Sequence, residues 1–287
     1  GADIITASAG TSNFRAGVNA GNSIASGGNY NTVVGDEAGT AITTGDSNVA
    51  VGYLALDANT TASFITAVGE KALSANTTGA KNTAIGRATL QATTTQSNNT
   101  AVGYNALSGG SNAASDNTAV GMDALTSTTS GANNTAVGVS ALTANTEGTR
   151  LTSVGSRSGM QNTTGSFNAF FGYDSGESNT TGASNTFVGD SAGRETTTAS
   201  SNTGVGQSAL LANTTGTLNV AVGALALDAN QTGAANTAVG YNALSANTGD
   251  GATAVGKDAL ELNTSGANTA VGANSLATVT SGTLNVA

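Results

Sequence analysis

The chain of 287 residues contains no cysteine, no histidine and no proline. Without cysteine and histidine it cannot form disulfides, thiolate nucleophiles, Ser-His-Asp triads or His-ligated zinc sites. The absence of proline suits a continuous ladder of backbone hydrogen bonds, because proline has no N–H to donate. The composition therefore favours a protein without catalysis, cofactor or metal.

Charge is also scarce. Charged residues make up 9% of the chain and the net charge is −9. The eight basic residues are scattered and form no patch, so we expect no binding to nucleic acid. The sequence contains no run of 18 apolar residues and no charged-then-apolar segment at its start. We therefore expect no membrane insertion in this segment and no export signal of its own.

What the sequence does contain is a glycine that returns at a nearly fixed interval. Of the fourteen intervals between Gly35 and Gly272, eleven are 17 residues, one is 18 and two are 16. The consensus is N-T-A-V-G-x-x-A-L-x-x-N-T-T-G-x-x, and a weaker copy surrounds Gly17. A fixed period of this size predicts a stack of equivalent structural units.

The length and composition of the repeat predict β-structure. Seventeen residues are too few for a helix–turn–helix repeat, and Gly, Thr and Asn are poor helix formers. Two short strands per repeat, separated by Gly- and Asn-containing turns, fit the length. We therefore predict an all-β fold: a parallel β-solenoid, or β-roll, of about sixteen 17-residue coils stacked about 4.8 Å apart.

The apolar positions predict that the coil is buried on two sides. Ala and Val are neighbours before the glycine, and Ala and Leu are neighbours after it. Since adjacent residues of a strand point to opposite faces, both faces of each strand are expected to be apolar. One face fills the coil, and the other, with Ala and Leu outermost, is expected to contact further copies of the chain.

The repeat varies along the chain. Residues 1–12 are expected to be an irregular segment, and residues 13–287 a single solenoid that stops within a repeat, as in a piece of a longer protein. Leu gives way to Gly at Gly159, Gly176 and Gly193. Larger side chains appear nearby, which we interpret as volume restored to the core; they are Met160, Phe167, Phe170, Phe171 and Phe187.

Three motifs resemble functional sites but have simpler explanations. The sequence around Gly204 and Gly206 matches a loose dinucleotide fingerprint, without a βαβ context. Asn-Thr-Thr tripeptides such as that at Asn59 match the glycosylation sequon, but their regular recurrence favours turns or stacked amide ladders. Acidic residues follow the repeated glycine, and surface solubility explains them better than a glycosidase acid pair; they are Asp36, Glu37, Glu70, Asp123, Asp174, Asp190 and Asp258. Stacking predicts the cross-coil pairs Glu70–Arg87 and Arg157–Asp174.

Tyrosine gives the more specific signal. Tyr53, Tyr104, Tyr173 and Tyr241 each directly follow the repeated glycine, at a position that carries many residue types in other copies. Such a variable position should face solvent. We predict these four tyrosines as the candidate surface for recognition of a sugar or a protein receptor.

The phrase V-G-Y-N-A-L with N-T-T-G spacers, over residues 13–287, resembles repeats of phage tail-fibre proteins. It is also similar to the head repeats of YadA-type trimeric autotransporter adhesins. This resemblance implies a left-handed β-roll built from three chains, with a virion or cell-surface location. This sequence departs from the adhesin family in its longer repeat and in the Leu position.

The expected function is therefore a structural and adhesive homotrimeric fibre, a virion tail fibre that attaches to a host-cell surface receptor, such as a glycan. The alternatives are the head of a bacterial trimeric surface adhesin and, from another class, an ice-binding solenoid. Thr occupies the second position of the motif in twelve of fifteen copies, which suits ice binding. Its neighbours Ala and Val, expected to be buried, argue against it. A polysaccharide-cleaving spike ranks third.

Overall fold

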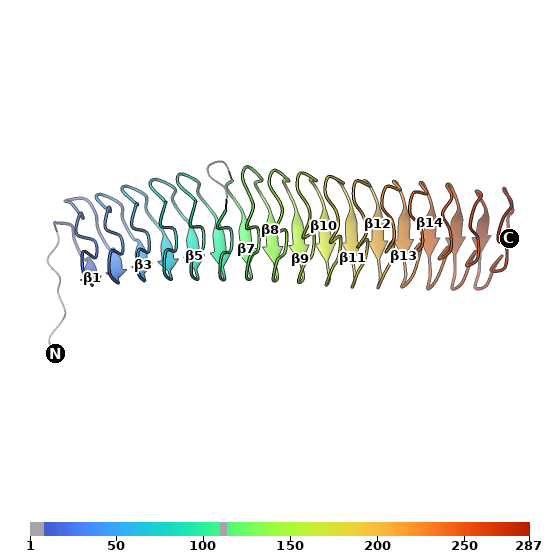
Figure 1. Cartoon of the computed structure of the whole chain (residues 1–287), viewed down its shortest axis with the longest axis horizontal. Coiled ribbons are helices and arrows are strands. Elements are labelled where there is room, and N and C mark those ends of the chain that lie inside the picture. The colour runs from blue at the N-terminus through green and yellow to red at the C-terminus, as the bar shows by residue number, and fades with distance from the viewer. Residues whose placement is uncertain (1–8, 110–113) are drawn as a thin grey trace. The chain divides into compact units, whose positions relative to one another are not determined.

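The computed structural model describes residues 9–109 and 114–287. These residues form two compact units, Gly1–Ser140 and Ala141–Ala287, built from the same coil (Figure 1). Each repeat contributes one short strand, and no helix occurs among the residues described. Residues 1–8 of the expected irregular segment lie outside the described part of the chain.

Strands of the first unit are β1 (Phe14–Ala16), β2 (Thr32–Val34), β3 (Val49–Val51), β4 (Thr66–Val68), β5 (Thr83–Ile85), β6 (Thr100–Val102), β7 (Thr118–Val120) and β8 (Thr135–Val137). Strands of the second unit are β9 (Thr152–Val154), β10 (Ala169–Phe171), β11 (Thr186–Val188), β12 (Thr203–Val205), β13 (Val220–Val222), β14 (Thr237–Val239), β15 (Thr253–Val255) and β16 (Thr269–Val271). Within each unit, consecutive strands pair in parallel, each residue opposite its counterpart in the next repeat. The predicted all-β parallel solenoid with coils of about 17 residues is confirmed, with about fifteen turns where about sixteen were predicted.

We number the coil from its opening Asn at position 1, which places the repeated glycine at position 5. The prediction of two strands per coil was wrong, because the residues after position 5 form turns. In the coil that begins at Asn236, Asn242 at position 7 and Leu244 at position 9 have φ values of 57° and 52°. These left-handed conformations fold the chain inward where a second strand was expected.

The repeated glycine is fixed by backbone geometry and by packing. Gly223 has φ 140°, a region that residues with a side chain rarely adopt. A Cβ atom on Gly223 would also lie 2.3 Å from the carbonyl oxygen of Gly240 in the next coil. The same contact recurs between successive position-5 glycines, so each of them marks a place where a side chain has no room between adjacent coils.

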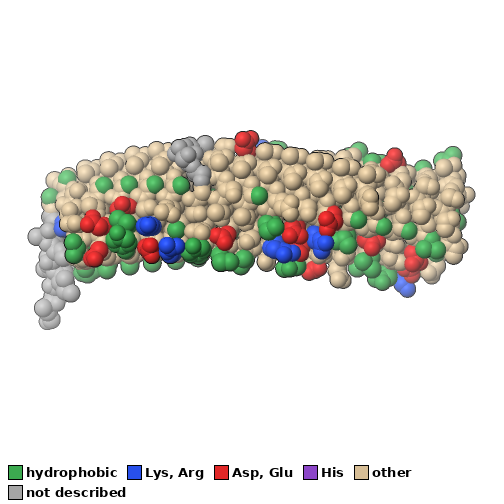
Figure 2. All heavy atoms as spheres, in the orientation of Figure 1, with side chains coloured by type: hydrophobic (Ala, Val, Ile, Leu, Met, Phe, Trp, Pro, Cys, Tyr) green, Lys and Arg blue, Asp and Glu red, His purple; other side chains and the backbone are tan. Residues whose placement is uncertain are grey.

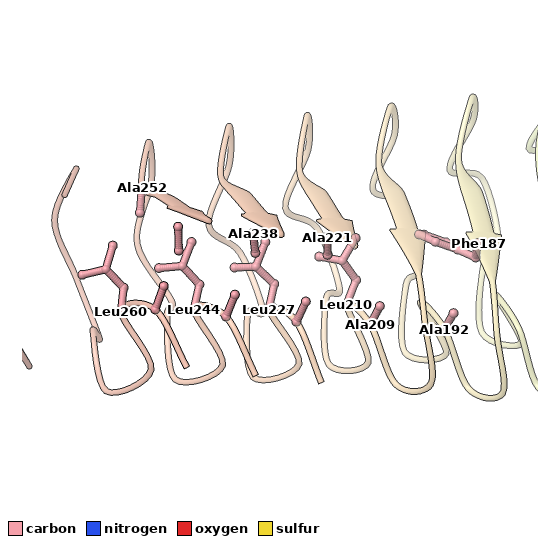
Figure 3. Close-up of a cluster of buried hydrophobic side chains, with 14 of the residues drawn as sticks. Phe187, Ala192, Ala209, Leu210, Ala221, Leu227, Ala238, Leu244, Ala252 and Leu260 are labelled. Carbon is pink, nitrogen blue, oxygen red and sulfur yellow. The ribbon is translucent and has the colours of Figure 1, made fainter. Parts of the chain in front are cut away.

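Small aliphatic side chains form the apolar half of the core. Ala221 at position 3, Ala226 at position 8 and Leu227 at position 9 are all fully buried, and equivalent residues stack above and below them (Figure 3). The expectation that Ala and Leu face outward was wrong. Ala, not Val, is the inward residue of the strand, and the turn directs Ala226 and Leu227 into the same interior.

Where the core departs from this pattern, large and small residues exchange places. Phe170 and Phe187 stand at position 3, fully buried and stacked with ring centroids 5.6 Å apart. Gly176 and Gly193 stand at position 9 of the same coils, where a Cβ would lie within 2.7 Å and 2.4 Å of those rings. Phe170 and Phe187 thus fill the space that Leu vacates, as predicted. Met160 is only partly buried and Phe167 and Phe171 are exposed, so these three do not fill the core.

Asparagine ladders form the polar half of the core. At position 1, the Oδ1 atom of Asn219 accepts a hydrogen bond from the backbone N of Asn236 in the next coil (3.0 Å). Its Nδ2 atom donates to the carbonyl of Gly233 (2.8 Å). Each such side chain therefore joins two coils at the turn before the strand, and stays satisfied although fully buried.

A second ladder runs through position 12, the Asn of the Asn-Thr-Thr tripeptides. Asn179 Nδ2 donates to Asn162 Oδ1 of the preceding coil (2.7 Å) and to the carbonyl of Gly182 (3.0 Å). The next residue, Thr180, donates its hydroxyl to the carbonyl of Thr197 one coil further on (3.0 Å). The predicted amide ladder between coils is thus confirmed.

Candidate functional site

The outward side of the strands is the most distinctive surface of both units. Because Ala at position 3 points inward, the residues at positions 2 and 4 point outward. We call these two rows the Thr column and the Val column, and together the strand face. The Thr column consists of Thr32, Val49, Thr66, Thr83, Thr100, Thr118, Thr135, Thr152, Ala169, Thr186, Thr203, Val220, Thr237, Thr253 and Thr269. The Val column consists of Val34, Val51, Val68, Ile85, Val102, Val120, Val137, Val154, Phe171, Val188, Val205, Val222, Val239, Val255 and Val271.

The strand face is apolar and open to solvent in the single chain. Every member of the Val column is partly or largely exposed, with Ile85 at 41% and Val222 and Val255 at 37%. Aliphatic side chains of this kind usually occur on strand faces that pack against something. The expected outer apolar surface exists, but it consists of Thr and Val rather than of Ala and Leu.

Larger exposed apolar side chains border the same face. They occupy the last position of the coil, two residues before the strand, or position 6, two residues after it; they are Tyr30, Phe64, Phe167, Leu218 and Leu284 at the last position, and Val18, Tyr53, Tyr104, Met122, Val139, Tyr173 and Tyr241 at position 6. In both units, Figure 2 shows most of the charged and larger apolar side chains along the lower edge. Polar side chains and backbone cover most of the remainder of that view.

The four predicted tyrosines are exposed, as expected from their position. The exposed fractions of Tyr53, Tyr104, Tyr173 and Tyr241 are 52%, 45%, 50% and 50%. Two coils intervene between Tyr53 and Tyr104, which places them about 14 Å apart along the stack. The tyrosines of one unit therefore stand singly at the border of the strand face and do not stack on one another.

In two of these tyrosines, an arginine side chain of the preceding coil lies over the ring. The Arg87 guanidinium lies 5.6 Å from the ring centroid of Tyr104, and that of Arg157 lies 5.2 Å from the ring of Tyr173. These distances are within the range of cation–π attraction. The pairing holds the rings in place and leaves about half of each accessible, which suits a recognition surface.

Three acidic residues near this border, Glu70, Asp174 and Glu177, form ion pairs with arginine. Both predicted cross-coil pairs are present: Arg87 Nε lies 3.3 Å from Glu70 Oε2, and Arg157 Nη2 lies 2.5 Å from Asp174 Oδ2. Glu177 is 3.5 Å from the same nitrogen of Arg157. The hydrogen bond from Arg157 to Asp174 raises the pKa of Arg157. Asp174 and Glu177 are thus joined through a guanidinium, unlike the two carboxylates that flank a glycosidic bond.

The remaining motifs have structural roles. Asn59 and Asn76, the first residues of two glycosylation sequons, are fully buried and donate to carbonyls of their own turns. Gly204 and Gly206 lie in and directly after strand β12, without the strand–turn–helix setting of a dinucleotide site. Across residues 9–109 and 114–287, no three metal-binding side chains come together. Over the same ranges, no helix has the length and apolar character needed to cross a membrane.

Sequence reasoning missed the strand face because Ala and Val are both apolar and alternate. Their size distinguishes them. Ala is the residue that fits beside Leu in a narrow coil, and a larger inward residue such as Val33 occurs where Gly39 replaces that Leu. No protein-family model matches the chain, and no curated protein is significantly similar to it.

Proposed function

We propose that this chain is a segment of a structural and adhesive fibre without catalytic activity, in which copies of the chain associate through the strand face. The observation that carries the proposal is the unbroken Val column, partly exposed in each coil of both units. An apolar row of this length on a single chain favours burial against a partner.

A second copy of the chain is the partner that fits best. A surface that repeats about every 4.8 Å is matched over its whole length only by a surface with the same spacing, and this chain has it. Eight strands present about 400 Å² of strand face per unit, if the face is ~10 Å wide. Two units offer about 800 Å² per chain, equal to the area that each partner of a standard two-chain interface buries and shared between two neighbours in a trimer.

The assembly that we propose is a homotrimer, on the basis of the resemblance to phage tail-fibre and YadA-type repeats. In it the Thr and Val columns face the common axis, and the tyrosines at position 6 lie at the border of the interface. Repetition of exposed rings on three chains favours attachment by many weak contacts to a host surface receptor, such as a glycan. We place the protein on a virion as a tail fibre, in preference to the head of a bacterial surface adhesin.

The solution mass of the purified chain, measured by light scattering, tests the proposal. One chain has a mass of 27.4 kDa, so a trimer weighs about 82 kDa. We expect the trimer mass at micromolar concentration. A stable, folded monomer would overturn the proposal, because the strand face would then be open to solvent in the functional molecule.

Ice binding is the second candidate, and one observation favours it. Thr and Val stand side by side on the outward face of almost every strand, so the chain presents regular rows of hydroxyl and methyl groups. The argument against ice binding assumed that Val is buried. A thermal hysteresis measurement separates the two candidates: activity from a monomer supports ice binding, and its absence from a trimer supports the fibre.

A further inference from the structure

Association through the strand face does not by itself define how far one chain is shifted along the stack of coils relative to its neighbour. Nearly all coils present the same Thr–Val pair, so two chains that slide by one coil keep almost all of their contacts. Repetitive strands generally specify register weakly. A fibre built in this way needs at least one layer that differs from the others.

Strand β10 provides such a layer. It has Ala169 where the neighbouring strands have Thr152 and Thr186, and Phe171 where they have Val154 and Val188. Among strands β9 to β16, Phe171 is the only aromatic residue of the Val column, and Ala169 the only Ala of the Thr column. The layer therefore has a protrusion beside a hollow on a face whose one other departure among strands β9 to β16 is Val220 in place of Thr.

The protrusion is held firmly. Phe170, between the two residues, points into the core, where it is fully buried and stacks on Phe187. Gly176, in the same coil, leaves room for that buried ring. The ring of Phe171 is 37% exposed on the opposite side of the strand. Since the strand is anchored from within, Phe171 cannot retreat from the face without disturbing the core.

We propose that Ala169 and Phe171 set the register between associated copies of this chain. The partner is a second copy, so this inference rests on the proposed function. In register, the β10 layers of all chains meet, and the methyl and hydroxyl groups missing at Ala169 leave space for the larger Phe171 rings. After a slip of one coil, each ring meets a Val layer without that space, and the hollow at Ala169 stays unfilled.

The first unit carries a similar irregularity in reverse order. Strand β1 has Phe14 in the row of the Thr column and Ala16 in the row of the Val column. Both units thus contain one strand in which Phe and Ala replace the usual pair. The experiment therefore examines β10 and leaves β1 unchanged.

Site-specific crosslinking tests the inference, because the chain has no cysteine of its own. Val188→Cys and Val205→Cys place single thiols in adjacent layers of the Val column. A tagged V188C chain and an untagged V205C chain are co-expressed, oxidised and separated on a non-reducing gel. Chains in register yield crosslinks between like chains, and chains that have slipped by one coil yield crosslinks between unlike chains.

In the unaltered background we expect crosslinks between like chains to predominate. In the A169T/F171V background, which restores the common Thr–Val pair, we expect the fraction of unlike crosslinks to rise about tenfold. Thr164→Ser with Thr181→Ser, at exposed turn positions away from the strand face and its border, is the matched control and should leave the pattern unchanged.

The outcomes separate this inference from the proposed function. A monomeric mass with no crosslinks overturns both. A multimer with equal amounts of like and unlike crosslinks in the unaltered background overturns the register role alone. If the A169T/F171V variant keeps strict register, the register role of β10 is also overturned, because another layer would then align the chains.

Discussion

At the scale of single residues, the repeated glycine meets two requirements that the structure allows to be separated. Gly223 and Gly272 have φ values of 140° and 127°, so both need a conformation that disfavours a side chain. A Cβ on Gly223 would lie 2.3 Å from a carbonyl oxygen of the next coil, whereas the nearest atom to a Cβ on Gly272 is 4.0 Å away. Of these two glycines, only Gly223 combines backbone strain with close approach.

We therefore expect Gly223→Ala to be clearly more destabilising than Gly272→Ala. Gly272→Ala should cost about 1–2 kcal/mol of unfolding free energy from backbone strain. Gly223→Ala should cost at least about 2 kcal/mol more, because the coils must separate to admit the methyl group. Urea denaturation measures both. Equal losses would show that close approach contributes nothing.

Two half-buried aspartates predict a dependence of stability on pH. Burial raises the pKa of Asp57 and of Asp228 above the ordinary value of 3.8, and Oδ1 of each is buried without a hydrogen-bond partner. Below pH 3.8 both residues are neutral in the folded and unfolded chain. As pH rises through the raised pKa, the folded state holds its protons more tightly, so ionisation favours unfolding.

Asp57→Asn should therefore leave stability unchanged at pH 3 and increase it slightly at pH 7, by about 0.5 kcal/mol or less. Asp228→Asn, at the same coil position in the second unit, should behave alike. Thermal unfolding at the two pH values measures the difference. A gain of equal size at both would attribute the effect to something other than the charge.

At the scale of the coil, sequence and structure agree on the period and differ on the path of the chain. The period of 17, the parallel pairing and the amide ladders follow from repeated Gly, Val and Asn. The inward direction of Leu244 could not be predicted in this way. It had been assigned from the alternation of side chains along a strand, which does not apply to residues in the left-handed conformation. The exposure of the four tyrosines was predictable from their variable position. The strand face was not, because it depends on which of Ala and Val points inward.

The exchange of large and small core residues predicts strong coupling within one coil. Gly193→Leu alone should be severely destabilising, because its Cβ would already lie 2.4 Å from the Phe187 ring. Phe187→Ala alone should cost about 3–5 kcal/mol through the cavity it leaves. The double variant restores the common Ala–Leu pair and should be close to the unaltered chain in stability. A double-mutant cycle from urea denaturation gives the coupling. Additive losses would contradict the exchange.

The amide ladder predicts an order among substitutions at Asn179. Asn179→Asp replaces a donor with a carboxylate that faces Asn162 Oδ1 and the carbonyl of Gly182, so we expect a loss of about 3 kcal/mol or more at pH 7. Asn179→Thr should cost less, since Thr196 occupies this position in the next coil, fully buried. The urea midpoints of the two variants test the order, and a more stable Asp variant would contradict it.

At the scale of the whole molecule, the strand face predicts how charge affects association. Val68→Asp with Val205→Asp places one carboxylate in the Val column of each unit. We expect a folded monomer of 27.4 kDa by light scattering, with an unchanged circular dichroism spectrum. Thr61→Asp with Thr181→Asp adds the same charge at exposed turn positions and should leave the mass of the unaltered chain's assembly unchanged. A trimer from both pairs would place the interface elsewhere.

Within each unit, each strand pairs only with the strands that precede and follow it in the sequence. The number of repeats in the gene can therefore change without a change in how the strands pair. Removal or duplication of one repeat within a unit would join two coils whose glycine, asparagine and alanine rows match as before. The intervals of 16 and 18 residues indicate that the loop length can vary between repeats. Length is thus a property that insertion and deletion of whole repeats can adjust without a new fold, and a layer such as β10 would keep chains of a new length aligned.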